Sequence, residues 1–208
     1  MIIINMKKIL IFLWLSIFIH CQTQNTNKVI PIIDDKFEKF DIEKFKKESI
    51  RETYVVKVEN FTIRQDSQNP GYLEELYKDD DYFILDKFFY ENGNIKKKGI
   101  SFNKGSSIGI WYHYNEEGNL TKEENTDFGY LFKPEDIVEY CKKNNIELSK
   151  GYHERNGHQI YKNELNGKKV WLISYIISIN KQDKEVELTL DGQTGKVVKR
   201  EEFPYDNY

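Results

Sequence analysis

The chain has 208 residues, enough for one or two small domains with a hydrophobic core. Its formal net charge is −3, and lysines alternate with acidic residues along most of the sequence, so the charge balance argues against nucleic-acid binding. Aromatic residues make up 14% of the chain and there are only four prolines, a composition that favours strands over disorder.

Residues 1–20 are expected to be a signal peptide rather than part of the fold. Lys7 and Lys8 precede an apolar run over 9–19, which is too short to cross about 30 Å of hydrocarbon. The chain turns polar directly after Cys21. The pattern therefore predicts export.

The position of Cys21 resembles a bacterial lipoprotein signal, in which this cysteine becomes the lipidated first residue of the mature protein. His20 stands where such signals usually carry a small residue, and there is no small-x-small site for ordinary secretory cleavage. The resemblance implies a lipoprotein of the cell envelope, anchored in the outer membrane through Cys21, with residues 21–35 as a tether. A soluble periplasmic or secreted protein is the alternative.

Residues 36–131 are predicted to form a β-rich region that opens with one short amphipathic helix. Phe37, Phe40 and Phe45 recur at near-helical spacing among charged residues. Packing on the core is the plain interpretation of this helix. Lying on a membrane surface is the alternative.

A hydrophobic period of two begins at about residue 52 and predicts strands joined by short turns. Tyr54, Val56 and Val58 share one face of the first strand. The segment 67–71 contains Asn-Pro-Gly and is predicted to be a loop, and the acidic run at 79–81 is predicted to join two strands. That run lacks the glycine and the spacing of a calcium loop, so we expect a solvated turn there.

A near-repeat follows, in which the sequence from Tyr90 to Ile95 returns from Tyr114 to Leu120. Both copies contain turn dipeptides, Asn-Gly and Glu-Gly, whose glycines accept the positive φ angles of tight hairpin turns. A single hairpin would leave its aromatic face in water, so neighbouring hairpins must cover one another. The repeat therefore predicts a meander of stacked hairpins.

This stretch, over about 88–124, resembles the bacterial MORN-variant repeat. The resemblance implies a β-hairpin repeat used for contacts, in proteins often described as antitoxin-like, and it implies no catalytic residue. The matching residues are Tyr90, Asn92, Gly93, Ile95, Lys96, Gly109, Trp111, Tyr114, Gly118 and Leu120.

Residues 132–208 are predicted to form a helix followed by an antiparallel sheet. Pro134 opens the helix, Asn-Gly at 166–167 is a hairpin turn, and the apolar run 170–179 is a central strand. The region resembles the PepSY-like exported module, which implies a small α+β fold outside the cytoplasm, sometimes with an inhibitory or interaction role. Together with the N-terminal signal this is typical of exported lipoproteins of the Bacteroidota. The matching residues are Asp191, Thr194, Gly195, Lys196, Val197 and Val198.

The sequence offers no recognisable catalytic or cofactor motif. His153 and His158 are five residues apart with Gly157 between them, which does not suit the shared helical face of a zinc site. His113 is expected to point outward from a strand. Cys141 is expected to be a buried apolar residue, with a reactive thiol as the alternative. We therefore predict neither an enzyme nor a protein with a metal, a cofactor or a small-molecule substrate.

The expected fold is α+β and β-dominated: a hairpin meander followed by a small module of one helix and an antiparallel sheet. The expected function is that of an exported, lipid-anchored, non-enzymatic protein-binding module of antitoxin or immunity type. A structural lipoprotein that maintains the envelope, or an inhibitor of an exported hydrolase acting through the C-terminal module, is the alternative. The candidate partner surface comprises Tyr90, Phe102, Tyr112 and Tyr114, each of which could instead fill the core.

Overall fold

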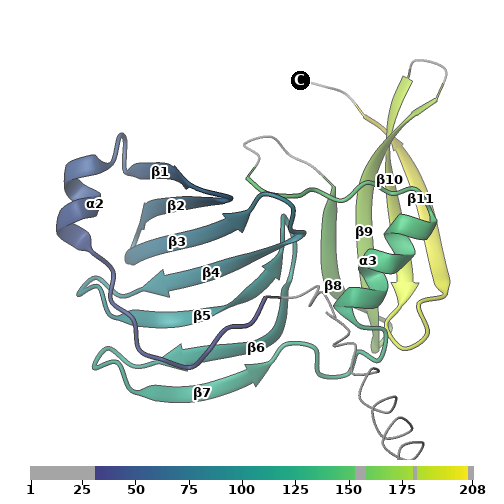
Figure 1. Cartoon of the computed structure of the whole chain (residues 1–208). Helices are drawn as coiled ribbons and strands as arrows, with labels where there is room; N and C mark the ends of the chain where they lie inside the picture. The colour runs from purple at the N-terminus through teal and green to yellow at the C-terminus, as the bar shows by residue number, and fades with distance from the viewer. Residues whose placement is uncertain (1–30, 153–157, 180–181, 206–208) are drawn as a thin grey trace, which may run out of the picture.

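The computed structural model describes residues 31–152, 158–179 and 182–205, which form two antiparallel sheets with a helix between them in sequence (Figure 1). The predicted signal peptide, Cys21 and His153 lie outside these residues. The β-dominated fold predicted from the sequence is confirmed.

The first sheet is a seven-stranded meander in which every strand pairs with its neighbours in the chain. The predicted hairpin meander is therefore correct, and its hairpins lie side by side in one continuous sheet. The strands are β1 (Thr53–Val58), β2 (Phe61–Gln68), β3 (Gly71–Lys78), β4 (Phe83–Phe89), β5 (Ile95–Phe102), β6 (Ser107–Tyr114) and β7 (Leu120–Asn125).

The turns follow the predicted chemistry, with one difference in length. Gly93 and Gly118 adopt φ angles of 81° and 87°, as the hairpin turns require. The loop predicted over 67–71 is shorter, because Ser67 and Gln68 pair with Tyr72 and Gly71 in the ladder between β2 and β3. The breaking effect of Asn-Pro-Gly is thus confined to the two residues between these strands.

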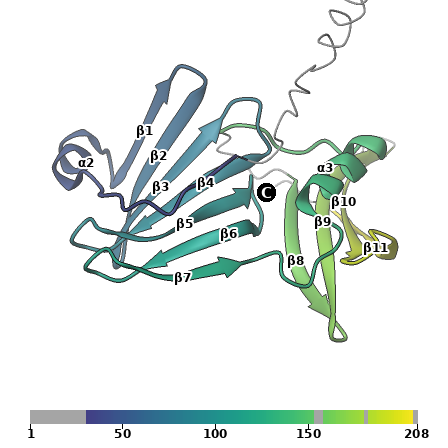
Figure 2. The same cartoon turned by 60° about the horizontal axis from the view of Figure 1, so that its bottom comes forward.

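The N-terminal helix is shorter than the sequence pattern suggests. Helix α2 covers Ile42–Glu48, and its N-terminus is capped by Asp41, whose side chain accepts a hydrogen bond from the Lys44 amide at 3.0 Å. The residues before it, 31–40, cross one face of the first sheet as an extended segment (Figures 1 and 2). Phe40 packs against Phe45, so this segment and α2 belong to the core.

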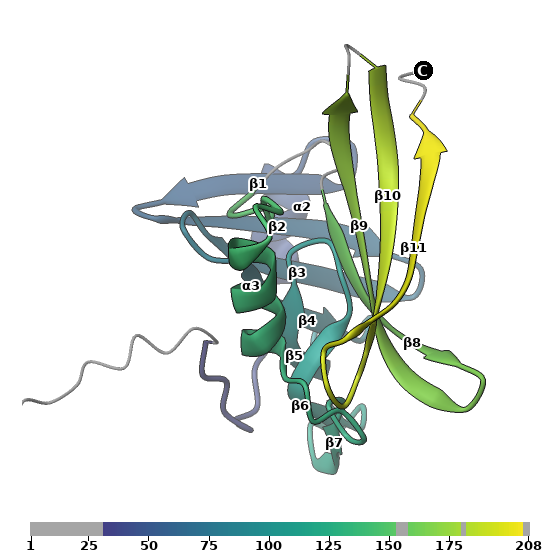
Figure 3. The ribbon, with the colours of Figure 1, turned by 90° about the vertical axis from the view of Figure 1, so that its right-hand side faces the viewer.

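The second sheet contains four strands in the order β11-β10-β9-β8. As predicted, the apolar run after Asn-Gly forms a central strand, β9, and a helix opened by Pro134 precedes the sheet. Strands β9 and β10 extend past the edge strand β1 of the first sheet (Figures 1 and 3). The elements are α3 (Pro134–Lys143), β8 (Gln159–Leu165), β9 (Lys168–Ile179), β10 (Gln182–Asp191) and β11 (Val197–Pro204).

One hydrophobic core joins the two sheets and α3. Phe83 and Phe102 come from the first sheet, Ile137 from α3, and Trp171 from β9. The rings of Phe102 and Trp171 meet edge to face with their centroids 5.9 Å apart. The second sheet therefore covers apolar residues of the first, and the two sheets depend on the same buried surface.

Candidate functional site

The two copies of the sequence repeat are linked by hydrogen bonds from the first turn to the second. The Tyr90 hydroxyl donates to the backbone oxygen of Tyr114 at 2.8 Å. The side-chain amides of Asn92 and Asn94 both donate to the backbone oxygen of Glu116, at 3.1 and 2.7 Å. The polar residues that define the repeat are thus used to hold neighbouring hairpins together.

Two of the four residues predicted to face a partner are buried, so the predicted exposure is wrong for these two. Phe102 is 1% exposed because the second sheet packs on it. Tyr114 is 4% exposed because the N-terminal segment covers it, and its hydroxyl donates to the backbone oxygen of Asp35 at 2.7 Å. Both residues stabilise the core.

The other two predicted residues, Tyr90 and Tyr112, are half-buried and do not form one surface. Tyr90 follows β4 at the turn, with the Lys96 ammonium 5.5 Å from its ring centroid. Tyr112 lies opposite Lys98 in the ladder, on the face crossed by the N-terminal segment. Tyr90 bonds to Tyr114 and Tyr112 packs against the core cluster that contains Tyr114, whereas Phe102 belongs to the other cluster, so the four positions do not form one exposed surface.

The opposite face of the first sheet carries a different aromatic and charged cluster, which we call the open face: Leu73, Phe88, Lys97, Trp111 and His113. Leu73, Phe88, Lys97 and His113 are successive partners across strands β3 to β6, which places them in one row. Among the described residues, the N-terminal segment, α2 and α3 all pack against the other face. Tyr152 packs against Tyr77 at one end of this side of the sheet, and the part around Leu73, Phe88 and Lys97 is the less covered one.

The centre of the open face is a cation–aromatic contact. The Lys97 ammonium lies 4.3 Å from the ring centroid of Phe88 and 5.4 Å from that of Trp111. Phe88 is half-buried, and its neighbour Phe89 is in the core. Adjacent residues of a strand point to opposite faces, so the aromatic pair at 88–89 could have indicated that one ring faces away from the core.

Trp111 is fixed in place by Gly99. The indole lies over this glycine so closely that an added Cβ would meet ring atoms at 2.2 Å. Its Nε1 donates to the Ile100 backbone oxygen at 3.0 Å. The glycine thus creates room for the indole, which is only 4% exposed and supports Phe88 and Lys97 from within the sheet face.

A row of ionisable side chains lies beside the aromatic cluster. Arg64 pairs with Glu75 at 3.2 Å and with Asp66 at 3.0 Å. Burial raises the pKa of Asp86 to about 7, a hydrogen bond with Ser101 opposes this rise, and the charge of Glu75 adds to it. The open face therefore contains a carboxyl group that titrates near neutrality.

The covered face contains Lys98, a fully buried lysine whose ammonium is held by the N-terminal segment. Its Nζ donates to the Lys36 backbone oxygen at 2.6 Å and to Glu38 Oε1 at 2.7 Å, and it also pairs with Asp34 at 3.4 Å. Glu38 in turn pairs with Lys87 at 2.5 Å. These contacts fix residues 34–38 on the sheet, so Asp34 and Asp35, at the end of the stretch predicted to be a tether, belong to the fold.

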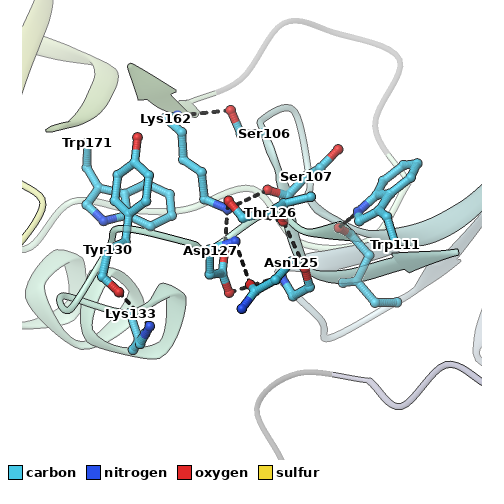
Figure 4. Close-up of polar contacts among 12 residues, drawn as sticks. Ser106, Ser107, Trp111, Asn125, Thr126, Asp127, Tyr130, Lys133, Lys162 and Trp171 are labelled. Atoms are coloured by element: carbon cyan, nitrogen blue, oxygen red, sulfur yellow. Dashed lines mark hydrogen bonds and ion pairs between the residues drawn. The ribbon is translucent and has the colours of Figure 1, made fainter. Parts of the chain in front are cut away.

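A second lysine, the partly buried Lys162, joins the two sheets (Figure 4). Its ammonium forms an ion pair with Asp127 and donates to the backbone oxygens of Ser107 at 2.8 Å and Thr126 at 2.9 Å. Burial lowers its pKa, which the Asp127 carboxylate partly offsets. The Trp171 ring centroid is 5.4 Å away. With its donors occupied, Lys162 stabilises the junction rather than serving as a nucleophile.

A pocket of about 510 Å³ lies beside this junction on the covered face. Ile32, Ile100 and Ile110 contribute its apolar wall, and Asp127 and Lys133 lie at its polar end. The Asp127 carboxylate also accepts a hydrogen bond from the Gly109 amide at 3.0 Å. The pocket thus has a preformed polar end, and residues 31–33 form part of its wall.

The remaining residues considered for catalysis or metal binding, one cysteine and two histidines, are buried or in contact with neighbouring residues. Cys141 is buried, and burial raises the pKa of its thiol to about 12, which agrees with the predicted structural role. His158 contacts the backbone oxygen of Glu147, and His113 Nε2 lies 2.9 Å from Glu124 Oε2. Within the described residues, no group of three or more His, Cys, Asp or Glu side chains is placed to hold a metal ion.

Comparison of the chain with protein-family models, with curated proteins and with solved structures gives no significant match. The resemblances to the MORN-variant repeat and to the PepSY-like module stay predictions. In the part of the chain that the structure describes, no helix is long and apolar enough to span a membrane.

Proposed function

We propose that this chain is an exported, lipid-anchored, non-enzymatic protein-binding module of antitoxin or immunity type, and that it binds its partner through the open face. The observation that carries the proposal is the contact of Lys97 with Phe88 and Trp111 on the less covered side of the sheet. A partly exposed aromatic ring such as Phe88 beside a cation, surrounded by polar groups, is typical of protein-recognition surfaces.

The organisation of the first sheet supports binding by a rigid surface. The buried indole of Trp111 is fixed by Gly99 and by its hydrogen bond to Ile100, so it gives the half-buried Phe88 and Lys97 a rigid support and limits the side-chain entropy that they lose on binding. The covered face supplies the stability, because the N-terminal segment and the second sheet both pack there. The open face is therefore available for contacts without cost to the core.

The surroundings of the buried charged groups support a non-enzymatic role. Lys98 and Lys162 each donate to several acceptors, so neither presents a free amine to a substrate. The thiol of Cys141 is held in its protonated form by burial. Asp86 is the group with the most suitable pKa, but it lies under neighbouring side chains, being 7% exposed.

The partner surface is tested with charge reversal at its centre. Lys97→Glu removes the cation–aromatic contact and inverts the charge, whereas Lys142→Glu makes the same change on α3, away from the open face. We expect a partner isolated from envelope extracts with the wild-type chain to bind the Lys142→Glu control equally well and the Lys97→Glu variant at least tenfold more weakly, as measured by calorimetry. Equal affinity of both variants would contradict the open face as the binding surface.

The anchor is tested separately, in cells that express the whole chain. A labelled lipid precursor should tag the wild-type protein and fail to tag the Cys21→Ala variant. Tagging of both proteins, or of neither, would contradict lipidation at Cys21.

A further inference from the structure

Three large apolar side chains, one near the start of the described residues and two between β7 and α3, are highly exposed. Ile32 is 75% exposed, Phe128 is 82% exposed and Leu131 is 69% exposed. A soluble monomer tolerates single exposed apolar residues, but a group of them marks a contact surface. We call these three residues the entry patch.

One member of the entry patch lines the pocket on the covered face, and the other two lie close in the sequence to residues that line it. Ile32 lines this pocket together with Asp127 and Lys133. Phe128 and Leu131 lie between Asp127 and Lys133 in the connection from β7 to α3. The patch thus combines residues from two separate parts of the chain.

Two charged groups of this region are paired within the chain, and Glu135, which also lines the pocket, is exposed to water. Asp127 forms its ion pair with Lys162, and the ammonium of Lys133 donates to the Tyr130 backbone oxygen at 2.5 Å. Insertion of Phe128 and Leu131 into an apolar medium would therefore not require Asp127 or Lys133 to leave water as an isolated charge.

The length of the preceding chain limits what can cover the entry patch. Residues 22–30 separate Cys21 from Pro31, and nine residues span at most about 30 Å when fully extended. A lipid on Cys21, eleven residues before Ile32, would keep Ile32 within about 40 Å of the bilayer, and tethering raises the effective concentration of the patch at the lipid surface. The nearest apolar medium is then the bilayer itself.

We infer that the entry patch inserts into the surface of the lipid bilayer and orients the protein with its open face toward the solvent. This inference rests on the proposed lipid anchor at Cys21. Ile32 and Ile110 line the pocket on the covered face, whereas Phe88, Lys97 and Trp111 lie on the other side of the sheet. Contact of the entry patch with lipid would thus leave the open face accessible to a partner.

The experiment uses the full-length lipidated chain in vesicles of phosphatidylethanolamine and phosphatidylglycerol. A polarity-sensitive fluorophore is attached through Phe128→Cys in one sample and through Val55→Cys in the other. Val55 is a matched control because it is an exposed apolar residue that shares a row with Arg64, on the side of the open face. Cys141 is buried and should not compete for the label.

We expect the fluorophore at position 128 to shift to the blue on vesicles and to become several-fold less accessible to aqueous iodide, while the fluorophore at position 55 stays as accessible as in detergent-free buffer. Vesicle-bound protein in which both positions remain equally accessible would overturn the membrane-facing patch and leave the anchor standing. Protein that stays in the supernatant after sedimentation would overturn both the anchor and the patch.

Discussion

The hydroxyl of Tyr90, in the first copy of the sequence repeat, donates a hydrogen bond to the backbone oxygen of Tyr114, its counterpart in the second copy, at 2.8 Å. The repeated tyrosine therefore has two different roles, since Tyr90 makes the contact between hairpins and Tyr114 fills the core. The two copies of the sequence repeat are therefore not structurally equivalent.

Removal of the Tyr90 hydroxyl should weaken this contact between the hairpins. We expect Tyr90→Phe to lower the free energy of unfolding by about 1 kcal/mol, because one partly buried hydrogen bond is lost while the ring remains. Tyr161→Phe is the control, since the Tyr161 hydroxyl bonds only to the exposed side chain of Gln159. Urea denaturation measures both, and equal effects of the two substitutions would argue against the contact between the repeats as a stabilising one.

Lys98 should be required to hold the N-terminal segment on the sheet. Lys98→Met keeps most of the side-chain volume but leaves Glu38 and Asp34 without this ammonium, so we expect a loss of at least about 2 kcal/mol in the free energy of unfolding. The exposed neighbour Lys96 provides the control, and Lys96→Met should change stability by less than about 0.5 kcal/mol. Hydrogen exchange should show faster exchange of the Phe40 and Ile95 amides in Lys98→Met, and unchanged protection there would contradict the assigned role.

The pH dependence of stability should contain a contribution from Asp86. Its pKa is raised to about 7 in the folded chain, so between roughly pH 4 and pH 7 the folded state binds more protons than the unfolded state. At low pH the Asp86 carboxyl group is protonated and does not lower the free energy of unfolding. As the pH rises, ionisation of Asp86 lowers that free energy by at most about 1.4 kcal/mol per pH unit. Above pH 7 its contribution is constant.

Asp86→Asn isolates this contribution because the amide does not ionise. We expect the stability of the variant, measured relative to wild type by urea denaturation at pH 4.5, 6 and 8, to increase steadily across the series. Parallel pH profiles for the two proteins would mean that Asp86 titrates in the folded chain as it does in the unfolded chain.

The contact of Trp111 with Gly99 can be measured with a double-mutant cycle. Gly99→Ala places a methyl group against the indole, where its Cβ would lie 2.2 Å from ring atoms, and we expect a cost of about 1–3 kcal/mol. In a Trp111→Ala background the same substitution should cost much less, since the ring is gone. Additive effects of the two substitutions would show that the indole is not held by this glycine.

The second sheet should be required for the first to fold. Phe83 and Phe102 belong to the core that includes Ile137 and Trp171, so removal of residues 132–208 exposes them to water. We expect the truncated chain to lack cooperative thermal unfolding and near-UV circular dichroism. A truncated chain that unfolds cooperatively would instead favour an independent C-terminal module, as the hydrolase-inhibitor alternative requires.

Most of the strand and turn pattern could be predicted because it depends on local chemistry. The glycines at 93 and 118 take the positive φ angles expected of them, and Pro134 opens the predicted helix. The prediction was less accurate for the first helix, because the spacing of Phe37, Phe40 and Phe45 is compatible with a helix whether or not the chain adopts one. The helix is capped by Asp41 and begins at Ile42, and the residues before Asp41 extend along the sheet.

The candidate site was predictable only in part. Phe102 and Tyr114 looked like surface residues because a hairpin considered alone has two faces in water, and their burial comes from segments distant in the sequence. Trp111 and Phe88 were visible as aromatic residues of the repeat region, but their joint position with Lys97 depends on the pairing of three strands. The alternation of Phe88 and Phe89 was the one local signal that could have pointed to the open face.

The sequence by itself determined the elements of this protein: alternating residues specify strands, Asn-Gly and Glu-Gly specify hairpin turns, and a proline followed by acidic residues begins a helix. These properties depend on interactions within a few residues, which the order of amino acids contains directly. The tertiary structure alone decided which face of the meander is covered and which is open. That choice follows from the positions of Lys98, Trp171 and the N-terminal segment, because contacts between residues tens of positions apart bury one face and leave the other in water.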